Sequence, residues 1–174
     1  MKKTMNKSKF PERKNIRLKN YDYSEPGAYF ITICTDKRRK ILSQIVGGDV
    51  LDAPNVELME YGRIADKYIN QLNCHYENIS VEEYVIMPNH IHLILFLNPN
   101  GASRTSPPTV KQHSIVPAFV SAFKRFCNKE CGESIWQRGF YDHIIRDKRD
   151  YDEITKYIHE NPLKWQFDEL FSEE

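Results

Sequence analysis

Four short stretches of this chain are rich in apolar and other β-forming residues, and apolar positions recur at helical spacing in three longer stretches. Alternation places side chains on opposite faces of a strand, whereas apolar residues three or four positions apart share one face of a helix. The pattern predicts strands at residues 28–35, 79–86, 90–97 and 140–145, and helices at residues 56–72, 114–130 and 148–161.

The order of these predicted elements is strand, helix, strand, strand, helix, strand and a last helix. Only Met87-Pro88-Asn89 separates the two middle strands, which predicts an antiparallel hairpin. A βαββαβ order matches the ferredoxin-like α+β sandwich, in which an antiparallel sheet carries helices on one face. We therefore expect a single domain over residues 28–174, with the last helix added to this sandwich.

The first 27 residues differ in character from the rest of the chain. They are polar and basic and end in Pro26-Gly27, which predicts an N-terminal arm. Eight lysines and arginines and one glutamate fall within residues 1–20, although the whole chain has a net charge of only +1. Clustered cations bind polyanions because they release counterions from phosphates, so the arm favours a nucleic-acid partner; a solvated tail has the same composition.

Composition narrows the class of protein. Of the 174 residues, 40% are hydrophobic and 28% charged, as expected for one globular domain with a buried core. No apolar run approaches the roughly 20 residues that cross a bilayer, and the lysine-rich start lacks the apolar stretch of a signal peptide, so we expect a cytoplasmic protein. The four cysteines form no CxxC motif, which favours reduced thiols. Prolines and serines at residues 98–108 predict a loop.

Two histidines separated by one aliphatic residue open the third predicted strand. His90 and His92 point to the same face of a strand, whereas Ile91 points to the other. Two neutral imidazoles side by side form half of a site for a divalent metal ion. Taken alone, the pair equally fits two partly exposed strand histidines.

The last predicted helix carries a second group of polar residues. Tyr157 and Asn161 are four positions apart and share one helix face, beside the apolar stripe of Tyr151, Ile154 and Ile158. A phenol oxygen can act as a nucleophile, and an amide oxygen is a suitable ligand for Mg²⁺ or Mn²⁺. The alternative is a tyrosine packed on the helix flank and an asparagine that ends the helix before a proline.

In their order along the chain, these motifs resemble the single-tyrosine HUH transposases, and more narrowly the REP-associated tyrosine transposases of the IS200-like group. The resemblance covers most of the chain. It rests on four segments: Arg13-Lys14-Asn15-Ile16-Arg17, Gly27-Ala28-Tyr29-Phe30-Ile31-Thr32, Trp136-Gln137-Arg138-Gly139-Phe140-Tyr141-Asp142-His143 and Tyr157-Ile158-His159-Glu160-Asn161-Pro162.

The resemblance implies roles for individual residues. The histidine pair that holds a metal would be His90 and His92, the nucleophile Tyr157 and the third metal ligand Asn161. The implied cofactor is Mg²⁺ or Mn²⁺, and the implied partner is single-stranded DNA with hairpin structure. The implied reaction is endonuclease cleavage and strand transfer through a 5′-phosphotyrosine intermediate. The resemblance allows a monomer or a homodimer that exchanges the tyrosine helix, with no membrane association.

Other residues are weaker candidates for the site. His143 alternates with Tyr141 along its strand and is either a supporting base or a hydrogen-bonded structural histidine. Tyr21, Tyr23 and Trp136 offer surfaces on which DNA bases can stack. The candidates for contacts with DNA phosphates are Arg13, Lys14, Arg17, Arg38, Arg39, Lys124, Arg125, Arg138 and Arg146.

Three other functions compete with an active mobile transposase. A domesticated enzyme would cut and join host repeat hairpins without moving itself. A binding module without catalysis would only hold structured single strands, but such a binder has no need of two histidines, a tyrosine and an asparagine together. A small metal-dependent hydrolase would leave Tyr157 as a structural residue and produce no DNA linked to protein.

Overall fold

The computed structural model describes residues 21–47, 54–98 and 115–171. Its centre is a four-stranded sheet with the strand order β4-β5-β1-β6, in which all neighbouring strands are antiparallel. These strands are β1 (Gly27–Cys34), β4 (Ile79–Ile86), β5 (His90–Leu97) and β6 (Tyr141–Ile145). The order is that of a ferredoxin-like sheet, so the predicted α+β class is confirmed, as is the hairpin between β4 and β5.

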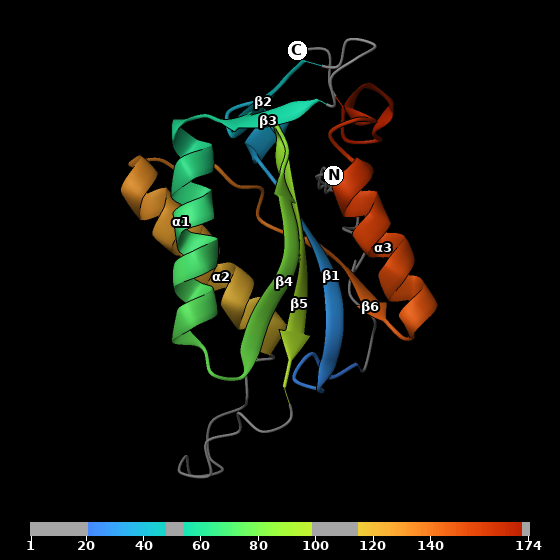
Figure 1. The fold of residues 1–174 in the computed structure, drawn as a ribbon. Coiled ribbons are helices and arrows are strands. Elements are labelled where there is room, and N and C mark those ends of the chain that lie inside the picture. Colours follow the sequence, from blue (N-terminus) through green and yellow to red (C-terminus); the bar gives the residue numbers. More distant parts are fainter. Residues whose placement is uncertain (1–20, 48–53, 99–114, 172–174) are drawn as a thin grey trace, which may run out of the picture.

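Three helices cover the sheet from both sides (Figure 1). Helices α1 (Glu60–His75) and α2 (Ile115–Cys131) lie on one face, and α3 (Lys148–Glu160) lies on the other. The main core fills the space between the sheet and the first two helices. The prediction of helices on one face is therefore correct for α1 and α2, and the added helix occupies the opposite face.

Alternation along β5 divides its side chains between the two faces. Ile91, Leu93 and Leu95 belong to the main core, as the sequence pattern predicts. Ile94 points the other way and forms a smaller core with Ile158 of α3 and with Ala28 of β1. His90 and His92 share that second face, so the strand directs both imidazoles toward the α3 side of the sheet.

Two short strands were absent from the sequence-based prediction. β2 (Ser43–Val46) and β3 (Asn55–Leu58) pair as a separate antiparallel ribbon. The predicted helix at residues 56–72 therefore began too early, because Leu58 fits its apolar stripe but lies in β3, and α1 starts at Glu60. Four-residue strands are too short for their period to be separated from an adjacent helical stripe.

The N-terminus of α1 approaches the backbone that follows β1. A Cβ atom built on Gly62 would lie 1.9 Å from the carbonyl oxygen of Leu42, so only glycine fits there. We expect Gly62→Ala to lower the free energy of unfolding by about 2–4 kcal/mol, because helix or backbone must shift. Urea unfolding measures this, with Gly139→Ala as the control, since a Cβ at Gly139 meets nothing within 4 Å. Equal stability of the two variants would contradict this close approach.

Some predicted features lie outside the described residues, namely residues 1–20 of the basic arm and residues 99–108 of the loop. The end of the arm is part of the domain, because Tyr23 is buried in the main core. All four cysteines are free thiols, and Cys34 and Cys127 are buried. None of the helices in the described ranges is long and apolar enough to span a membrane.

Candidate active site and metal centre

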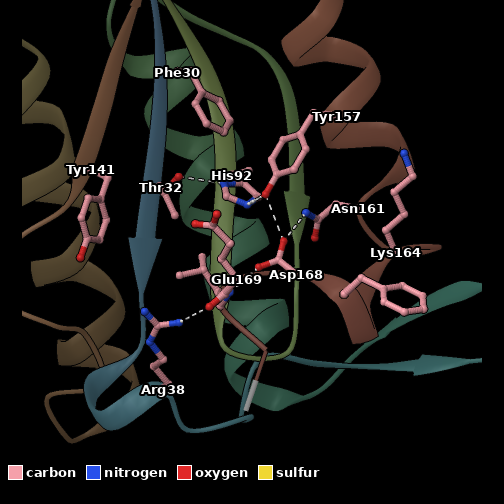
Figure 2. A pocket seen from close by; sticks show the side chains of 12 residues that line it. Phe30, Thr32, Arg38, His92, Tyr141, Tyr157, Asn161, Lys164, Asp168 and Glu169 are labelled. Atoms are coloured by element: carbon pink, nitrogen blue, oxygen red, sulfur yellow. Dashed lines mark hydrogen bonds between the residues drawn. The ribbon is translucent and has the colours of Figure 1, made fainter.

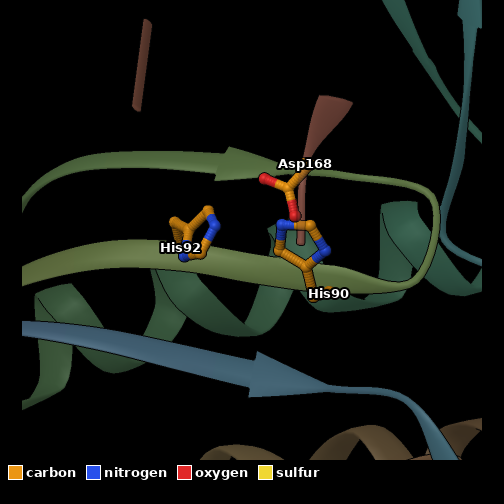
Figure 3. A group of neighbouring side chains, drawn as sticks. All are labelled: His90, His92 and Asp168. Atoms are coloured by element: carbon orange, nitrogen blue, oxygen red, sulfur yellow. The ribbon is translucent and has the colours of Figure 1, made fainter. Parts of the chain in front are cut away.

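His90 and His92 lie side by side on β5, next to Asp168 (Figure 3). Their ring centroids are 4.4 Å apart, and both side chains are buried. One ring nitrogen of each and a carboxylate oxygen of Asp168 all lie within 4.8 Å of one another. Ligands of one divalent cation, with bonds of about 2.0–2.2 Å, are separated by about 3–4.4 Å, so small adjustments bring the three atoms to ligating distance.

Neighbouring side chains hold the two imidazole rings in place. His90 Nδ1 lies 2.8 Å from Asn89 Oδ1, and His92 Nδ1 lies 2.8 Å from Thr32 Oγ1. Asn89 itself donates from Nδ2 to the carbonyl oxygen of Leu170, which fixes the direction of its amide. With both Nδ1 atoms engaged, a metal ion would bind through the Nε2 atoms, and that of His92 also lies 3.3 Å from Tyr157 Oη.

Burial keeps both imidazoles neutral near pH 7. Desolvation lowers the pKa of His90 to about 4, against the opposing effect of the Asp168 charge. Desolvation also lowers the pKa of His92 well below its usual value, and neighbouring His90 adds to this shift. A neutral imidazole presents a lone pair to a metal ion, so the pair is available for binding at neutral pH.

The lowered pKa values predict that the metal-free protein loses stability in mild acid. Between about pH 6.5 and pH 4 the unfolded chain binds a proton at each imidazole that the folded chain does not, so the free energy of unfolding falls as the pH falls through this window. The slope is at most about 1.4 kcal/mol per pH unit for each histidine. Urea unfolding with chelator should give a steeper fall for wild type than for His90→Gln. Parallel pH profiles would contradict neutral burial of His90.

Tyr157 and Asn161 come from the last turn of α3 and from its C-cap. Asp147 caps the start of this helix by accepting a hydrogen bond from the Asp150 N–H, and Asn161 ends it. Burial of Ile158 fixes the rotation of the helix, and this rotation directs Tyr157 and Asn161 toward the histidines (Figure 2). Tyr157 Oη lies 3.3 Å from His92 Nε2, while 42% of the residue remains exposed, so an external substrate can reach it.

Asp168 completes the cluster and was not among the site residues expected from sequence. Its Oδ2 atom accepts hydrogen bonds from Tyr157 Oη at 3.0 Å and from Asn161 Nδ2 at 2.8 Å. After α3 the short 3-10 helix Trp165–Phe167 turns the chain back, and the Trp165 ring lies 5.8 Å from that of His90. The chain thereby returns a carboxylate to the histidine pair (Figure 2).

Tyr157 is protonated in this arrangement. Burial raises the pKa of the phenol, and the negative charge of Asp168 raises it further. Nucleophilic attack near neutral pH therefore needs added positive charge or a base at the site.

Two buried atoms without hydrogen-bond partners among the described residues indicate where a divalent cation could bind. His90 Nε2 and Asn161 Oδ1 have no hydrogen-bond partner within the described part of the chain. A buried polar atom without a partner costs about 1–3 kcal/mol. Both are ligand atoms suited to a divalent cation, and Asp168 adds an anionic oxygen. The residues present thus fit a metal held by His90 and His92, with oxygen from Asn161 or Asp168.

Of the remaining candidates within the described ranges, the structure brings only Arg38 to this cluster. Arg38 reaches the open cavity of about 620 Å³ in front of Tyr157, which Tyr141 also lines. His143 is directed instead to Asp150 at the start of α3, with 2.8 Å between Nε2 and the carboxylate. Tyr23 and Trp136 are buried, which corrects the expectation that their rings could stack on DNA bases.

The other candidate cations have varied surroundings. Arg39 pairs with Glu133, and Lys124 donates to the carbonyl oxygens of Gln137 and Gly139. Arg125 lies over the ring of Phe126, and Arg138 and Arg146 are exposed. The candidates outside the described residues are Arg13, Lys14 and Arg17.

Comparison with known proteins gives a consistent result. The family model described as "Transposase IS200 like" matches residues 23–161. A putative REP-associated tyrosine transposase of Haemophilus influenzae is 28% identical over 158 residues, covering 88% of this chain and 81% of the relative. The REP-associated tyrosine transposase of Escherichia coli K12 is 33% identical over 85 residues, covering 48% and 44%.

A solved structure supports the same fold. A REP-associated tyrosine transposase, solved bound to a REP hairpin, superposes with a TM-score of 0.58 and 21% identity, covering 87% of this chain and 75% of that one. The family model matches most of the chain and includes both histidines, Tyr157 and Asn161. The chain therefore belongs to the IS200-like transposase family of enzymes, and REP-associated tyrosine transposases are among its relatives.

Proposed function

We propose that this protein is a metal-dependent endonuclease and strand transferase that acts on single-stranded DNA containing a hairpin. The observation that carries the proposal is the meeting of Tyr157 Oη with His92 Nε2 at 3.3 Å and with Asp168 Oδ2 at 3.0 Å, on the open side of the sheet. A solvent-accessible nucleophile beside a metal half-site suits attack on a phosphodiester. The hairpin is inferred from the relative solved with a REP hairpin.

Tyr157 would act as the nucleophile. Its oxygen forms a bond to phosphorus, the bond from phosphorus to the 3′ oxygen breaks, and the freed 3′ oxygen takes up a proton. Asp168 already accepts the phenol hydrogen bond and is placed to receive the phenolic proton. The resulting 5′-phosphotyrosine conserves the ester, so a second 3′-hydroxyl can reverse the step and join two strands.

His90 and His92 would hold Mg²⁺ or Mn²⁺, with an oxygen ligand from Asn161 or Asp168. When bound, the cation supplies positive charge that polarises the phosphate and offsets the charge growing on its non-bridging oxygens. Thr32 and Asn89 orient the two imidazoles through their Nδ1 atoms. This orientation preserves the directions of both Nε2 atoms in the absence of a ligand.

The arrangement within one chain favours action as a monomer. Tyr157 of α3 meets His92 of the same chain, and Ile158 packs against the sheet of the same chain. One copy therefore contains both the nucleophile and the proposed ligands. A dimer that exchanges α3 would have to replace these contacts with the same ones from a second copy.

The test is a cleavage assay with the full-length protein and a labelled hairpin oligonucleotide that has single-stranded flanks. With Mn²⁺ or Mg²⁺ we expect a product that migrates with the protein on a denaturing gel, and with EDTA we expect none. The protease-treated product should retain a peptide at its 5′ end. Metal-dependent cleavage that leaves no protein-linked DNA would instead indicate a hydrolase with a structural Tyr157.

A further inference from the structure

The turn after β1 contains a backbone feature that the proposed function does not yet use. Lys37 has φ of 53° and Arg38 has φ of 56°, so two consecutive non-glycine residues adopt the left-handed conformation. Each such residue is held against a steric cost and persists only where its surroundings fix it. Strained positions of this kind cluster at ligand-binding sites because they aim a side chain.

Hydrogen bonds fasten this turn to the hairpin that carries the histidine pair. The hydroxyl of buried Thr35 shares its one proton between the carbonyl oxygens of Arg39 at 2.8 Å and Asn89 at 3.0 Å, and the Thr35 N–H donates to Asn89 O at 2.9 Å. Asn89 in turn holds His90 through its side chain. Thr35 and Asn89 therefore connect the strained turn to His90, one of the proposed metal ligands.

The turn places the guanidinium of Arg38 at the mouth of the cavity that contains Tyr157 and His92 (Figure 2). Its Nη1 atom donates to the carbonyl oxygen of Glu169 at 3.3 Å, and its positive charge contributes to the lowered pKa of His90. A carbonyl oxygen takes one of the five N–H donors of a guanidinium, and the planar fork that remains suits a phosphate.

Arg38 differs from the other cationic side chains near the site in its position relative to the cavity. Of the candidate DNA-binding cations in the described ranges, Arg38 alone lines this cavity. Its neighbour Arg39 points to Glu133. Lys164 also lines the cavity but lies at hydrogen-bonding distance from Glu160 on its own side of the site. Arg38 is thus the cation that stands across the cavity from the nucleophile.

We propose that Arg38 binds the DNA phosphate that Tyr157 attacks, and that the strained turn fixes its guanidinium for this contact. The inference rests on the proposed function, since it assigns a ligand to the same site. A single-stranded phosphodiester is the ligand class, because it is anionic, accepts two parallel hydrogen bonds and can reach an open cavity.

The test measures binding of a fluorescein-labelled hairpin oligonucleotide to full-length variants that also carry Tyr157→Phe, so that no cleavage occurs. Arg38→Ala should weaken the Kd about tenfold or more and lower the slope of log K against log salt by about 0.7, the value for one phosphate contact on a single strand. Arg38→Lys should fall between Arg38→Ala and Arg38. Arg149→Ala, a control on exposed α3, should change the Kd less than about twofold.

A modified oligonucleotide identifies the phosphate. With one uncharged methylphosphonate at the mapped cleavage position, Arg38 and Arg38→Ala should bind with Kd values within about twofold of each other, because the contact is already lost. A tenfold difference that persists on the modified strand overturns the assignment, as does an unchanged Kd on normal DNA. Failure of the proposed function is distinct, since it appears as missing adducts with wild type.

Backbone strain has its own readout. Arg38→Gly removes the guanidinium and the steric cost together, whereas Arg38→Ala keeps the cost. We expect Arg38→Gly to melt on the order of 4 °C above Arg38→Ala while binding DNA equally poorly. Loss of binding in the more stable variant cannot come from misfolding. A melting temperature for Arg38→Gly below that of Arg38→Ala would contradict the claim that backbone strain at this turn fixes the guanidinium.

Discussion

Replacing Tyr157 with phenylalanine should abolish covalent adducts between the protein and DNA. The substitution removes only the oxygen that we propose as the nucleophile, which lies beside His92 Nε2. The Thr32 hydroxyl also contacts the His92 ring, but it lies 2.8 Å from Nδ1. We expect adduct formation to fall by at least about a thousandfold in the denaturing gel assay, below detection. The ring keeps its edge contact with Phe30, with 6.1 Å between centroids, so the fold should be retained.

The matched control is Tyr151→Phe, which removes a hydroxyl from the same helix. The Tyr151 ring packs against Phe96 in the smaller core, two turns before Tyr157, and does not line the cavity. We expect this variant to form adducts within about threefold of wild type. DNA binding by Tyr157→Phe should also persist, which separates lost chemistry from lost recognition. Adducts that survive in Tyr157→Phe would assign the nucleophile to another residue.

Much of the fold was predictable because its signals are local. Alternation in β5 assigns Ile91 and His92 to opposite faces, and the apolar stripe of α2 assigns Phe119 and Phe123 to the core. These periods belong to single elements and need no knowledge of neighbours. The face that α3 covers is a tertiary property. It depends on the packing of Ile158 against Ile94 of the sheet, and the spacing of residues along the helix does not specify this contact.

The site shows the same division between local and distant signals. His90 with His92, and Tyr157 with Asn161, are pairs within one strand or one helix end, so spacing alone brings each pair together. Asp168 reaches the site only because the chain reverses after Pro162 and Trp165 packs beside His90. In the sequence this aspartate is only one of several acidic residues near the C-terminal end of the chain. A contact between segments that are distant in the sequence produces no periodic pattern by which it could be predicted.

The backbone strain at Lys37 and Arg38 also could not be predicted from the amino-acid composition. A basic turn is visible in the sequence, but nothing in its letters marks two left-handed residues where glycine is usual. The turn is held by tertiary contacts of buried Thr35, whose hydroxyl lies within hydrogen-bonding distance of the carbonyl oxygens of Arg39 and Asn89. Tertiary hydrogen bonds thus override the local preference, and they do so beside the proposed catalytic residues.

Replacing both His90 and His92 with glutamine should remove specific binding of Mn²⁺. The two imidazoles are the proposed nitrogen ligands, and an amide offers a weaker oxygen or nitrogen donor at altered length. We expect each single substitution to weaken the Kd at least about a hundredfold and the double variant to show no saturable binding by calorimetry. His159→Gln is the control, because His159 lies on α3 but points to Glu83 at 2.9 Å, on the outside of the site.

The same titration distinguishes the two possible oxygen ligands. Asn161→Ala removes an amide whose buried Oδ1 has no hydrogen-bond partner among the described residues, and Asp168→Asn removes a charge while keeping the shape of the side chain. A ligand loss should weaken Mn²⁺ binding about ten- to a hundredfold, whereas Glu169→Gln, which removes a neighbouring charge outside the ligand group, should change it less than about threefold. If the double histidine variant still binds one Mn²⁺ with unchanged affinity, the metal centre lies elsewhere and the paired imidazoles serve only the packing of α3 on the sheet.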